Sequence, residues 1–399
     1  MPADPAVFTL FQVGLLIVVA SICSELFRKI KLPGVIGAIL VGLFIGGQGG
    51  LGLIRDVTVI NLLASLGAIL ILFTTGVQFD ASSFWKVGKT AFLTTTIGVI
   101  LSILLGYGTG LALGFSWQAA FLLGAVLAPS GTSVIAAMLS YEGIVETKIG
   151  STLLTAVILD DIEGILILTI ALSAIAEGAF SASSLISIAV VASLFILVSI
   201  YIGSKILPFV IKQLQGFVSD EFLFIILLGL GLMLAFAATM FGLSAITGAF
   251  IMGATIPYQR IGEKLAEKIS MMKELFAAIF FTSIGLAISP IGMAAVLPSG
   301  LIILGTAILA RVAGGLIGGC AAGFRGKTLW ATTIGLAVRA EMSFIIAYEG
   351  VAMGIVTADF LTLTAIAVIG SMIIVLPLFS KLIKNNQELK DQKAEYIQY

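Results

Sequence analysis

Long apolar blocks, separated by short polar or Gly/Pro-containing joints, run through nearly the whole chain. The blocks cover residues 8–27, 33–47, 58–79, 90–113, 117–140, 149–176, 182–203, 221–240, 242–256, 271–289, 299–323, 328–348 and 359–383. Most are long enough to cross the ~30 Å hydrocarbon core of a bilayer as an α-helix. The pattern predicts an all-α polytopic membrane protein with about thirteen transmembrane helices.

The composition fits a membrane protein and excludes several partners. The chain is 59% hydrophobic and 11% charged, with a mean hydropathy of +1.19. Its net charge is zero and it has no basic run outside the joints, which argues against nucleic acid as a partner. No metal-ligand cluster is visible, so we expect no cofactor. The chain has no histidine, and any response to pH must therefore come from carboxylates.

The basic residues predict the orientation in the membrane. If the amino terminus lies outside, all but three of the 21 basic residues fall in the cytoplasmic joints, in the tail or at the cytoplasmic ends of blocks; the exceptions are Arg55, Arg311 and Arg339. The positive-inside rule then predicts an external amino terminus and a cytoplasmic carboxyl terminus in a cell (plasma or inner) membrane. Because no basic residue precedes the first block, we expect that block to remain as a helix rather than to be a cleaved signal peptide.

The two halves of the chain carry similar segments. Residues 32–42 resemble residues 243–253 at an offset of 211, and Gly76 matches Gly285 at an offset of 209. The paired segments lie seven places apart in the order of predicted helices, an odd number, so the second repeat is inverted relative to the first. Inverted repeats are typical of secondary transporters, whose substrate site lies near the midplane where broken helices meet.

Two polar interruptions occupy corresponding positions in the halves. Residues 128–133 (APSGTS) interrupt the fifth block, and residues 338–343 (VRAEMS) interrupt the twelfth, about 210 positions later. Pro129 removes a backbone donor, which either breaks the helix or only kinks it for packing. We expect breaks at 128–133 and 339–343 that approach each other and free carbonyls and hydroxyls for a cation.

Three carboxylates lie inside the sixth block. Asp160 and Asp161 are adjacent in the middle of residues 149–176. A charge at this depth costs at least a few kcal/mol and is normally kept where it lines an ion or proton path. The two side chains point about 100° apart on a helix, so we expect them to have different roles. Glu163 either extends the acidic face or is a structural carboxylate.

Two arginines lie inside later blocks. Arg311 is the only charge in its block, so it requires a carboxylate partner, and an aspartate of the pair is the obvious one. Arg339 and Glu341 pair either with each other or with the facing helix ends. The alternative to a role in the site is that these two residues form a structural cross-brace.

These motifs resemble the cation/proton antiporter superfamily, in its sodium/proton antiporter branch. The resemblance rests on Leu-Asp-Asp-Ile at 159–162 after the polar break, on Arg311 in a Gly-rich helix, and on Arg-Ala-Glu at 339–341. It implies a transmembrane antiporter domain over residues 1–384 and a short tail at 385–399. Within that domain it implies a dimerising scaffold (about 8–80 and 221–290), an elevator core (about 89–176 and 299–384) and a linker helix (about 182–214).

The resemblance also implies roles for individual residues. Asp161 is similar to the family's cation- and proton-binding aspartate, and Asp160 to the partner of the basic residue, here Arg311. The remaining candidates are ligands in the first break, namely Ser130, Thr132 and Ser133, and supporting residues, namely Glu341, Arg339 and Glu163. The transported Na⁺ is thus expected to be bound by Asp161 and Asp160.

The implied function is exchange of cytoplasmic Na⁺, or alternatively Li⁺ or K⁺, for external H⁺ by a membrane-embedded homodimer that is not an enzyme. The tail is too short for the nucleotide-binding regulatory domain of potassium-efflux relatives. Two departures from the family pattern are Arg311, where many electrogenic members have lysine, and Glu163, where an apolar residue is expected. Stoichiometry, the choice between Na⁺ and K⁺, and the pH range stay open.

Two rival classes fit less well. An organic-anion symporter needs a pocket for a carboxylate, which the acidic residues disfavour. An intramembrane aspartyl protease needs its aspartates on two helices, whereas Asp160 and Asp161 share one.

Overall fold

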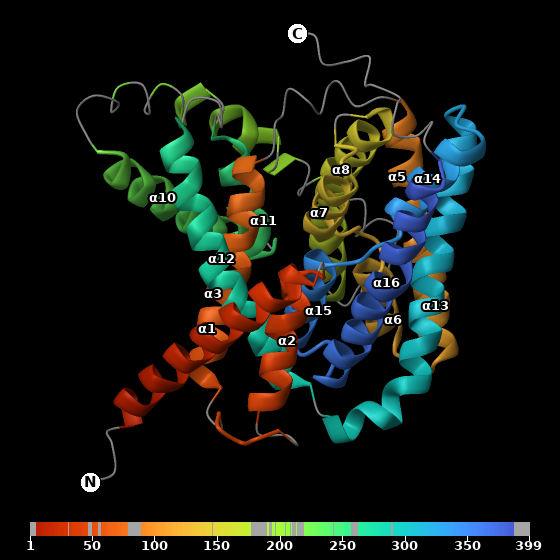
Figure 1. The fold of residues 1–399 in the computed structure, drawn as a ribbon. Coiled ribbons are helices and arrows are strands. Elements are labelled where there is room, and N and C mark those ends of the chain that lie inside the picture. The colour runs from red at the N-terminus through yellow and green to blue at the C-terminus, as the bar shows by residue number, and fades with distance from the viewer. Residues whose placement is uncertain are drawn as a thin grey trace. The chain divides into compact units, whose positions relative to one another are not determined.

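The chain is all-helical throughout the part that the structure, a computed structural model, describes (Figure 1). The described residues are 5–30, 32–46, 50–54, 57–78, 89–145, 147–176, 190, 194–195, 197–203, 205–207, 209, 213, 219–241, 243–256, 262–288 and 290–386. An isolated β-bridge pairs Gly46 with Ile54.

The helices follow the apolar blocks. They are α1 (Pro5–Lys29), α2 (Gly34–Ile45), α3 (Thr58–Gln78), α5 (Lys89–Ala112), α6 (Trp117–Val126), α7 (Thr132–Glu142), α8 (Lys148–Ala176), α10 (Asp220–Met240), α11 (Ala245–Ala254), α12 (Gly262–Ala287), α13 (Pro290–Ala321), α14 (Gly326–Gly335), α15 (Glu341–Ala352) and α16 (Asp359–Lys384). Among the described residues, seven helices are long and apolar enough to span a bilayer, by length and composition alone.

The predicted all-α membrane architecture is confirmed. The fifth block is divided into α6 and α7 and the twelfth into α14 and α15, as the polar interruptions predict. The seventh block, 182–203, lies largely outside the described residues, so the count of thirteen helices stays a prediction. Two helices begin well before their blocks. α12 includes a charged first stretch before residue 271, and α13 begins at Pro290, because proline is well suited to the first turn of a helix, and continues through Pro298.

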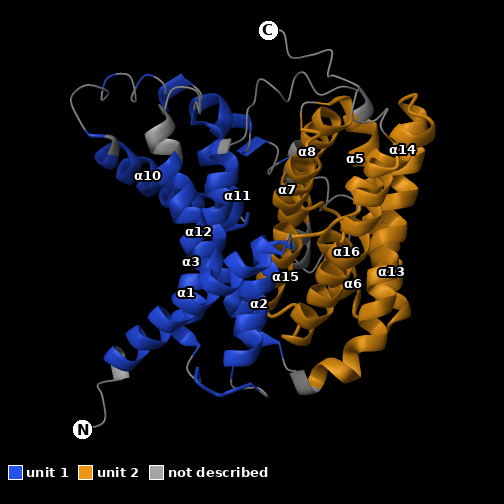
Figure 2. Cartoon of the chain, in the orientation of Figure 1, with its two compact units in different colours: residues 1–81, 172–291 blue, residues 82–171, 292–399 orange. Residues whose placement is uncertain are grey.

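The chain divides into two compact units (Figure 2). Unit 1 comprises residues 1–81 and 172–291, and unit 2 comprises residues 82–171 and 292–399. Each unit is therefore built from one segment of each half of the chain. The assignment of scaffold, core and linker roles to particular ranges stays a prediction.

Unit 1 contains two equivalent helix contacts that are especially close. A Cβ on Gly42 of α2 would lie 2.1 Å from the Thr282 carbonyl oxygen of α12, close to Gly285. A Cβ on Gly76 of α3 would lie 2.1 Å from the Phe250 carbonyl oxygen of α11, and Gly253 packs back on α3. Because neither joint has room for a side chain, the glycines let the helix backbones touch. The glycines noted in the sequence repeat thus mark its two closest helix contacts.

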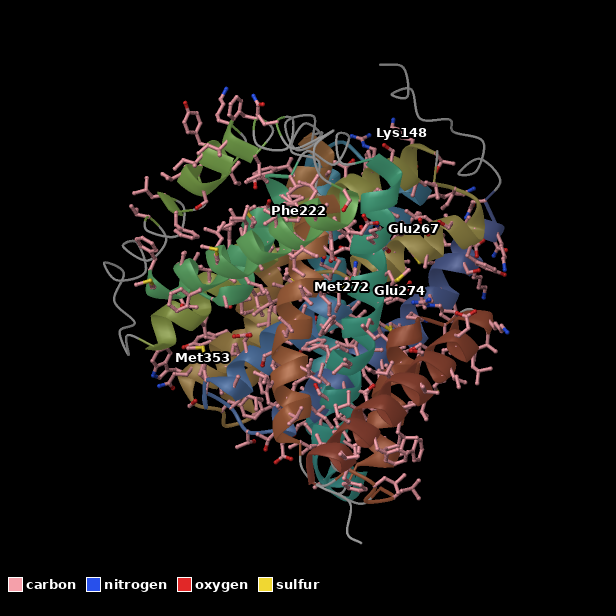
Figure 3. All side chains as sticks on the ribbon, turned by 90° about the vertical axis from the view of Figure 1, so that its left-hand side faces the viewer. Lys148, Phe222, Glu267, Met272, Glu274 and Met353 are labelled. Atoms are coloured by element: carbon pink, nitrogen blue, oxygen red, sulfur yellow. The ribbon has the colours of Figure 1, made fainter. Side chains whose placement is uncertain are left out.

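The polar end of α12 carries ion pairs with neighbouring helices of unit 1. Glu274 pairs with Arg28 of α1 at 3.5 Å, and Lys268 pairs with Glu221 of α10. Figure 3 labels Glu267, Met272 and Glu274 along this helix. Such exposed pairs contribute only about 0–1 kcal/mol each. They therefore mark where α12 leaves the apolar region rather than what stabilises it.

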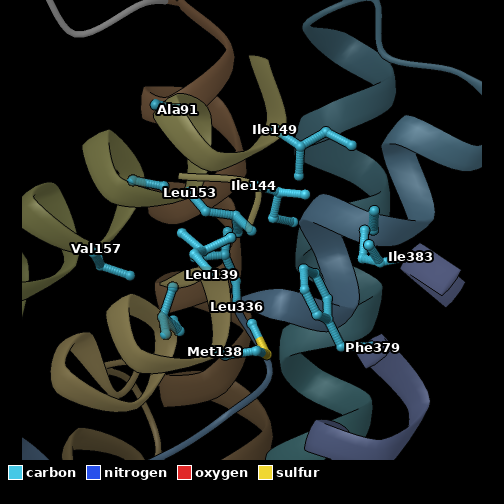
Figure 4. Packing of buried hydrophobic residues seen from close by; sticks show 13 residues of the cluster. Ala91, Met138, Leu139, Ile144, Ile149, Leu153, Val157, Leu336, Phe379 and Ile383 are labelled. Carbon is cyan, nitrogen blue, oxygen red and sulfur yellow. The ribbon is translucent and has the colours of Figure 1, made fainter. Parts of the chain in front are cut away.

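Unit 2 contains an apolar cluster beside the broken helices (Figure 4). Leu139 of α7, Leu153 of α8, Leu336 after α14 and Phe379 of α16 are all buried in it. Elsewhere in this unit a Cβ on Gly314 of α13 would lie 2.4 Å from the Gly98 Cα of α5. Close packing of these helices fixes the positions of the buried polar side chains that they carry.

Candidate functional site

The two broken helices of unit 2 meet at their gaps. Residues 127–131 join α6 to α7, and residues 336–340 join α14 to α15. The Gly131 N–H donates to the Val338 carbonyl at 2.9 Å. A Cβ on Gly131 would lie 2.5 Å from the Cβ of Ala340, so this approach requires glycine. The breaks that the sequence predicts therefore do come together, although each non-helical segment lies slightly earlier than predicted.

Polar side chains of the first break bind the second. Ser130 Oγ donates to the Leu336 carbonyl at 2.8 Å. Ser133 donates to Glu341 twice, from its N–H at 3.2 Å and from its Oγ at 2.8 Å. Thr132 is the first residue of α7 and Glu341 the first of α15. The Glu341 carboxylate thus lies at the amino end of the partner helix, where a negative charge is stabilised.

Arg311 lies at the centre of this arrangement and is fully buried. Its Nη2 forms an ion pair with Oδ2 of Asp160, which is also fully buried, and donates to Ser130 Oγ at 2.9 Å. Its Nη1 lies 3.4 Å from the carbonyl oxygens of both Thr95 and Ala128. Removing either charge of such a pair would leave the other unpaired in a dry site, at a cost of about 3–5 kcal/mol.

Arg339 is also fully buried but has no carboxylate within ion-pair distance among the described side chains. It donates to the Pro129 carbonyl at 3.2 Å and to the Ala307 carbonyl at 3.0 Å, and its Nη2 lies 3.5 Å from Ser102 Oγ. Arg339 and Glu341 therefore do not pair with each other. Each contacts the facing break instead, which is one of the two predicted arrangements.

Several buried oxygens of unit 2 have no hydrogen-bond partner among the described residues. They are Asp160 Oδ1, Glu163 Oε2, Thr333 Oγ1 and Ser343 Oγ. Glu163 accepts a hydrogen bond at its other oxygen from Thr96 Oγ1 of α5 at 2.5 Å. Open carboxylate and hydroxyl oxygens are the ligands that hard cations such as Na⁺ prefer. No group of three or more His, Cys, Asp or Glu suited to a resident metal occurs among the described residues.

The structure places Asp161 on α8 directly after Asp160, and its side chain lies outside the described part. The next turn of α8 faces the crossing, because a Cβ on Gly164 would lie 3.2 Å from Pro129 and 3.4 Å from Met342. α8 therefore brings its acidic turn to the point where the two breaks meet.

Sequence reasoning missed the contribution of α5. Thr95 and Gly98 contact Arg311, and Thr96 contacts Glu163, all from one turn of that helix. The available signal was the run of three threonines at 94–96 in an apolar block. Hydroxyls in a membrane helix often bond their own backbone, so the run by itself did not indicate a site.

Two helices broken at one crossing, with a buried ion pair and open acidic oxygens beside it, define a secondary membrane transporter. Residues 14–381 match the family model described as the transmembrane sodium/hydrogen exchanger. The chain belongs to this family of ion exchangers.

Two relatives and one solved structure are similar to nearly the whole chain. The chain is 27% identical over 377 residues to a Na⁺/H⁺ antiporter of Enterococcus hirae, covering 93% of this chain and 98% of the relative. It is 28% identical to the Na⁺/H⁺-K⁺ antiporter GerN of Bacillus cereus, covering 92% and 94%. The fold is similar to the sodium proton antiporter MjNhaP1 of Methanocaldococcus jannaschii, with a TM-score of 0.79 and 20% identity over 96% and 98% of the two chains.

Proposed function

We propose that this protein is a secondary antiporter that exchanges Na⁺ for H⁺ across the membrane. The observation that carries the proposal is the buried Arg311–Asp160 pair at the crossing of two broken helices. Arg311 is a buried positive charge that cannot leave, and the acidic turn of α8 lies beside it. This arrangement supports a site whose remaining negative charge must be neutralised by a mobile cation before the site can cross the bilayer. The family and the named relatives support the same exchange.

In this proposal Asp161 is the shared site for the cation and the proton. One carboxylate is neutralised by either ligand, so binding of one requires loss of the other. This competition couples the two fluxes, provided that the site opens to one side of the membrane at a time. Asp160 supplies a second anionic oxygen, its unpartnered Oδ1, to the cation.

Ser130, Thr132 and Ser133 complete the proposed ligand set. The proton of Ser130 Oγ is donated to Leu336, and that of Ser133 Oγ to Glu341. Because these protons are committed elsewhere, remaining hydroxyl lone pairs are available to a cation. Arg311, Glu341, Arg339 and Glu163 support the site in this proposal.

K⁺ is the second candidate ion. The Bacillus cereus relative is named a Na⁺/H⁺-K⁺ antiporter. The same oxygens bind both ions, and selectivity depends on cavity size and on the number of ligands. We therefore include K⁺ as an alternative substrate.

Unit 2 is proposed as the moving core and unit 1 as the scaffold that forms a homodimer. All the proposed ligands belong to unit 2, which supports this unit as the part that carries the ion. We place the chain in the cell membrane with an external amino terminus and a cytoplasmic carboxyl terminus, on the distribution of basic residues.

Purified protein in liposomes with an imposed pH gradient tests the function. Addition of Na⁺ should collapse the gradient in protein-containing vesicles and leave protein-free vesicles unchanged. Parallel additions of Li⁺, K⁺ and Ca²⁺ rank the substrates. A gradient that no monovalent cation dissipates would contradict the proposal.

A further inference from the structure

We propose that Glu163 is a further ligand of the transported cation and raises the site's preference for small monovalent ions. This inference rests on the exchange proposed above and assigns to Glu163 a direct contact instead of a supporting role. Two carboxylates, those of Asp160 and Glu163, lie on one turn of α8. In each, one oxygen is bound by a neighbouring side chain and the other, the open oxygen, has no hydrogen-bond partner among the described residues.

The two open oxygens have matching environments. Asp160 Oδ2 is bound by Arg311, while Oδ1 is buried without a partner. Glu163 Oε1 accepts from Thr96 Oγ1 at 2.5 Å, while Oε2 is buried without a partner. Residues three apart on a helix are neighbours on its surface, with about 5–6 Å between their Cβ atoms. One cation lying between the two side chains is within reach of both open oxygens.

The charges around Glu163 favour a cation there. Among the described residues, Arg311 forms an ion pair with Asp160, and no ion pair involves Glu163. Arg339 donates to backbone carbonyls instead. Glu163 lies one turn from Asp160 on α8, so its carboxylate belongs to the same site. When this carboxylate is ionised it has no fixed counter-charge among the described ion pairs, and a bound cation would supply one.

α5 positions Glu163 directly and Asp160 through Arg311. The Thr95 carbonyl lies 3.4 Å from Arg311 Nη1, and the next residue, Thr96, fixes Glu163. Gly98 leaves space for the guanidinium, because a Cβ there would lie 2.9 Å from Arg311 Nη1. One helix turn thus orients the ion pair and the additional carboxylate together, which makes the two open oxygens a preorganised set.

An additional anionic ligand changes which ion is preferred. Coulomb attraction rises as the distance falls, so small ions gain more than large ones from a further carboxylate oxygen. A site with Glu163 should favour Li⁺ and Na⁺ over K⁺. Without Glu163, the preference should move toward K⁺.

The test compares Glu163→Gln with Thr96→Val and with Glu349→Gln in liposomes. Glu349 is a half-buried glutamate of α15, outside the proposed ligand set. For each protein, the half-saturating concentrations of Na⁺, Li⁺ and K⁺ are measured from the decay of the pH gradient. Glu163→Gln should raise the Na⁺ and Li⁺ values roughly tenfold or more, with a smaller change for K⁺. Thr96→Val should shift them the same way to a lesser extent, and Glu349→Gln should behave as wild type.

A second measurement covers variants that exchange too slowly. The rise in melting temperature of the purified protein on titration with NaCl or KCl reports binding without transport. Glu163→Gln should need more Na⁺ for the same rise, and Glu163→Asp should recover part of the difference. An unchanged Na⁺/K⁺ preference in both measurements would overturn the role of Glu163 while leaving exchange intact. Failure of the wild-type protein to exchange would instead remove the proposed function.

Discussion

The guanidinium of Arg339 donates a hydrogen bond to the Pro129 carbonyl oxygen at 3.2 Å, so an arginine of one helix break satisfies an acceptor that the other break exposes. Pro129 lies between α6 and α7, where carbonyls lack their helical donors. Arg339 also donates to Ala307 of α13 at 3.0 Å. The Arg339 side chain therefore connects the crossing of the two breaks to α13.

Arg339→Gln should destabilise the protein and slow exchange. The substitution leaves the carbonyls of Pro129 and Ala307 without their donor in a buried site, at about 1–3 kcal/mol for each unsatisfied group. Melting of the detergent-solubilised protein measures the loss. Arg28→Gln is the control, because Arg28 is exposed and its ion pairs contribute little. Equal melting temperatures for the two variants would contradict this role of Arg339.

Asp161→Asn should abolish cation-dependent proton movement without unfolding the protein. An amide has no charge to be neutralised, so neither Na⁺ nor H⁺ can drive the proposed competition. The pH gradient in liposomes should then persist when Na⁺ is added. Asp359→Asn, at the exposed start of α16, is the matched control and should exchange normally. Ordinary rates in Asp161→Asn would refute the assignment.

Exchange should respond to membrane potential. Arginine stays charged at all accessible pH values, so Arg311 is not itself a proton carrier. If Na⁺ displaces Arg311 from Asp160 and both aspartates are protonated on the return, two protons move per Na⁺ and each cycle carries charge. A potential imposed across the vesicles should then change the rate or end point of exchange. Insensitivity to potential would favour one-for-one exchange, with Asp160 and Arg311 a permanent structural pair.

Gly314→Ala should impair exchange more than Gly305→Ala on the same helix. A Cβ on Gly314 would lie 2.4 Å from the Cα of Gly98, so α13 must move away from α5 and carry Arg311 with it. A Cβ on Gly305 meets nothing within 4 Å, and alanine there should be neutral or stabilising by up to about 1 kcal/mol. Transport rate and melting temperature distinguish the two variants. Similar behaviour would mean that the α5–α13 contact does not position Arg311.

The sequence was sufficient to locate the breaks and the buried charges. Pro129, Arg311 and Asp160 are conspicuous because proline and charge are costly inside apolar helices. Proline requires a break or kink in the helix, and a buried charge requires a partner. The pairing of Arg311 followed from the need for a carboxylate. The helix boundaries at residues 262 and 290 did not follow, because hydropathy reports burial in lipid rather than continuity of the helix.

Contacts between helices were harder to predict. The partners of Thr96 and Arg339 depend on how each helix is rotated, and helices that are apolar all round give no periodic signal for rotation. For Arg339, both a neighbouring Glu341 and distant carbonyls satisfied the electrostatic requirement. Only the three-dimensional packing of α13 against the crossing decides in favour of Pro129 and Ala307.

The paired glycines of unit 1 make the two halves of the chain complementary to each other. Gly42 meets Gly285, and Gly76 meets Gly253, so each half of the chain offers the same surface to the other. In geometry this is an isologous interface, of the kind that two identical subunits form about a two-fold axis. Two half-length chains with this surface would therefore be complementary as inverted copies of each other. A single chain that contains both halves keeps the same pairing within one molecule.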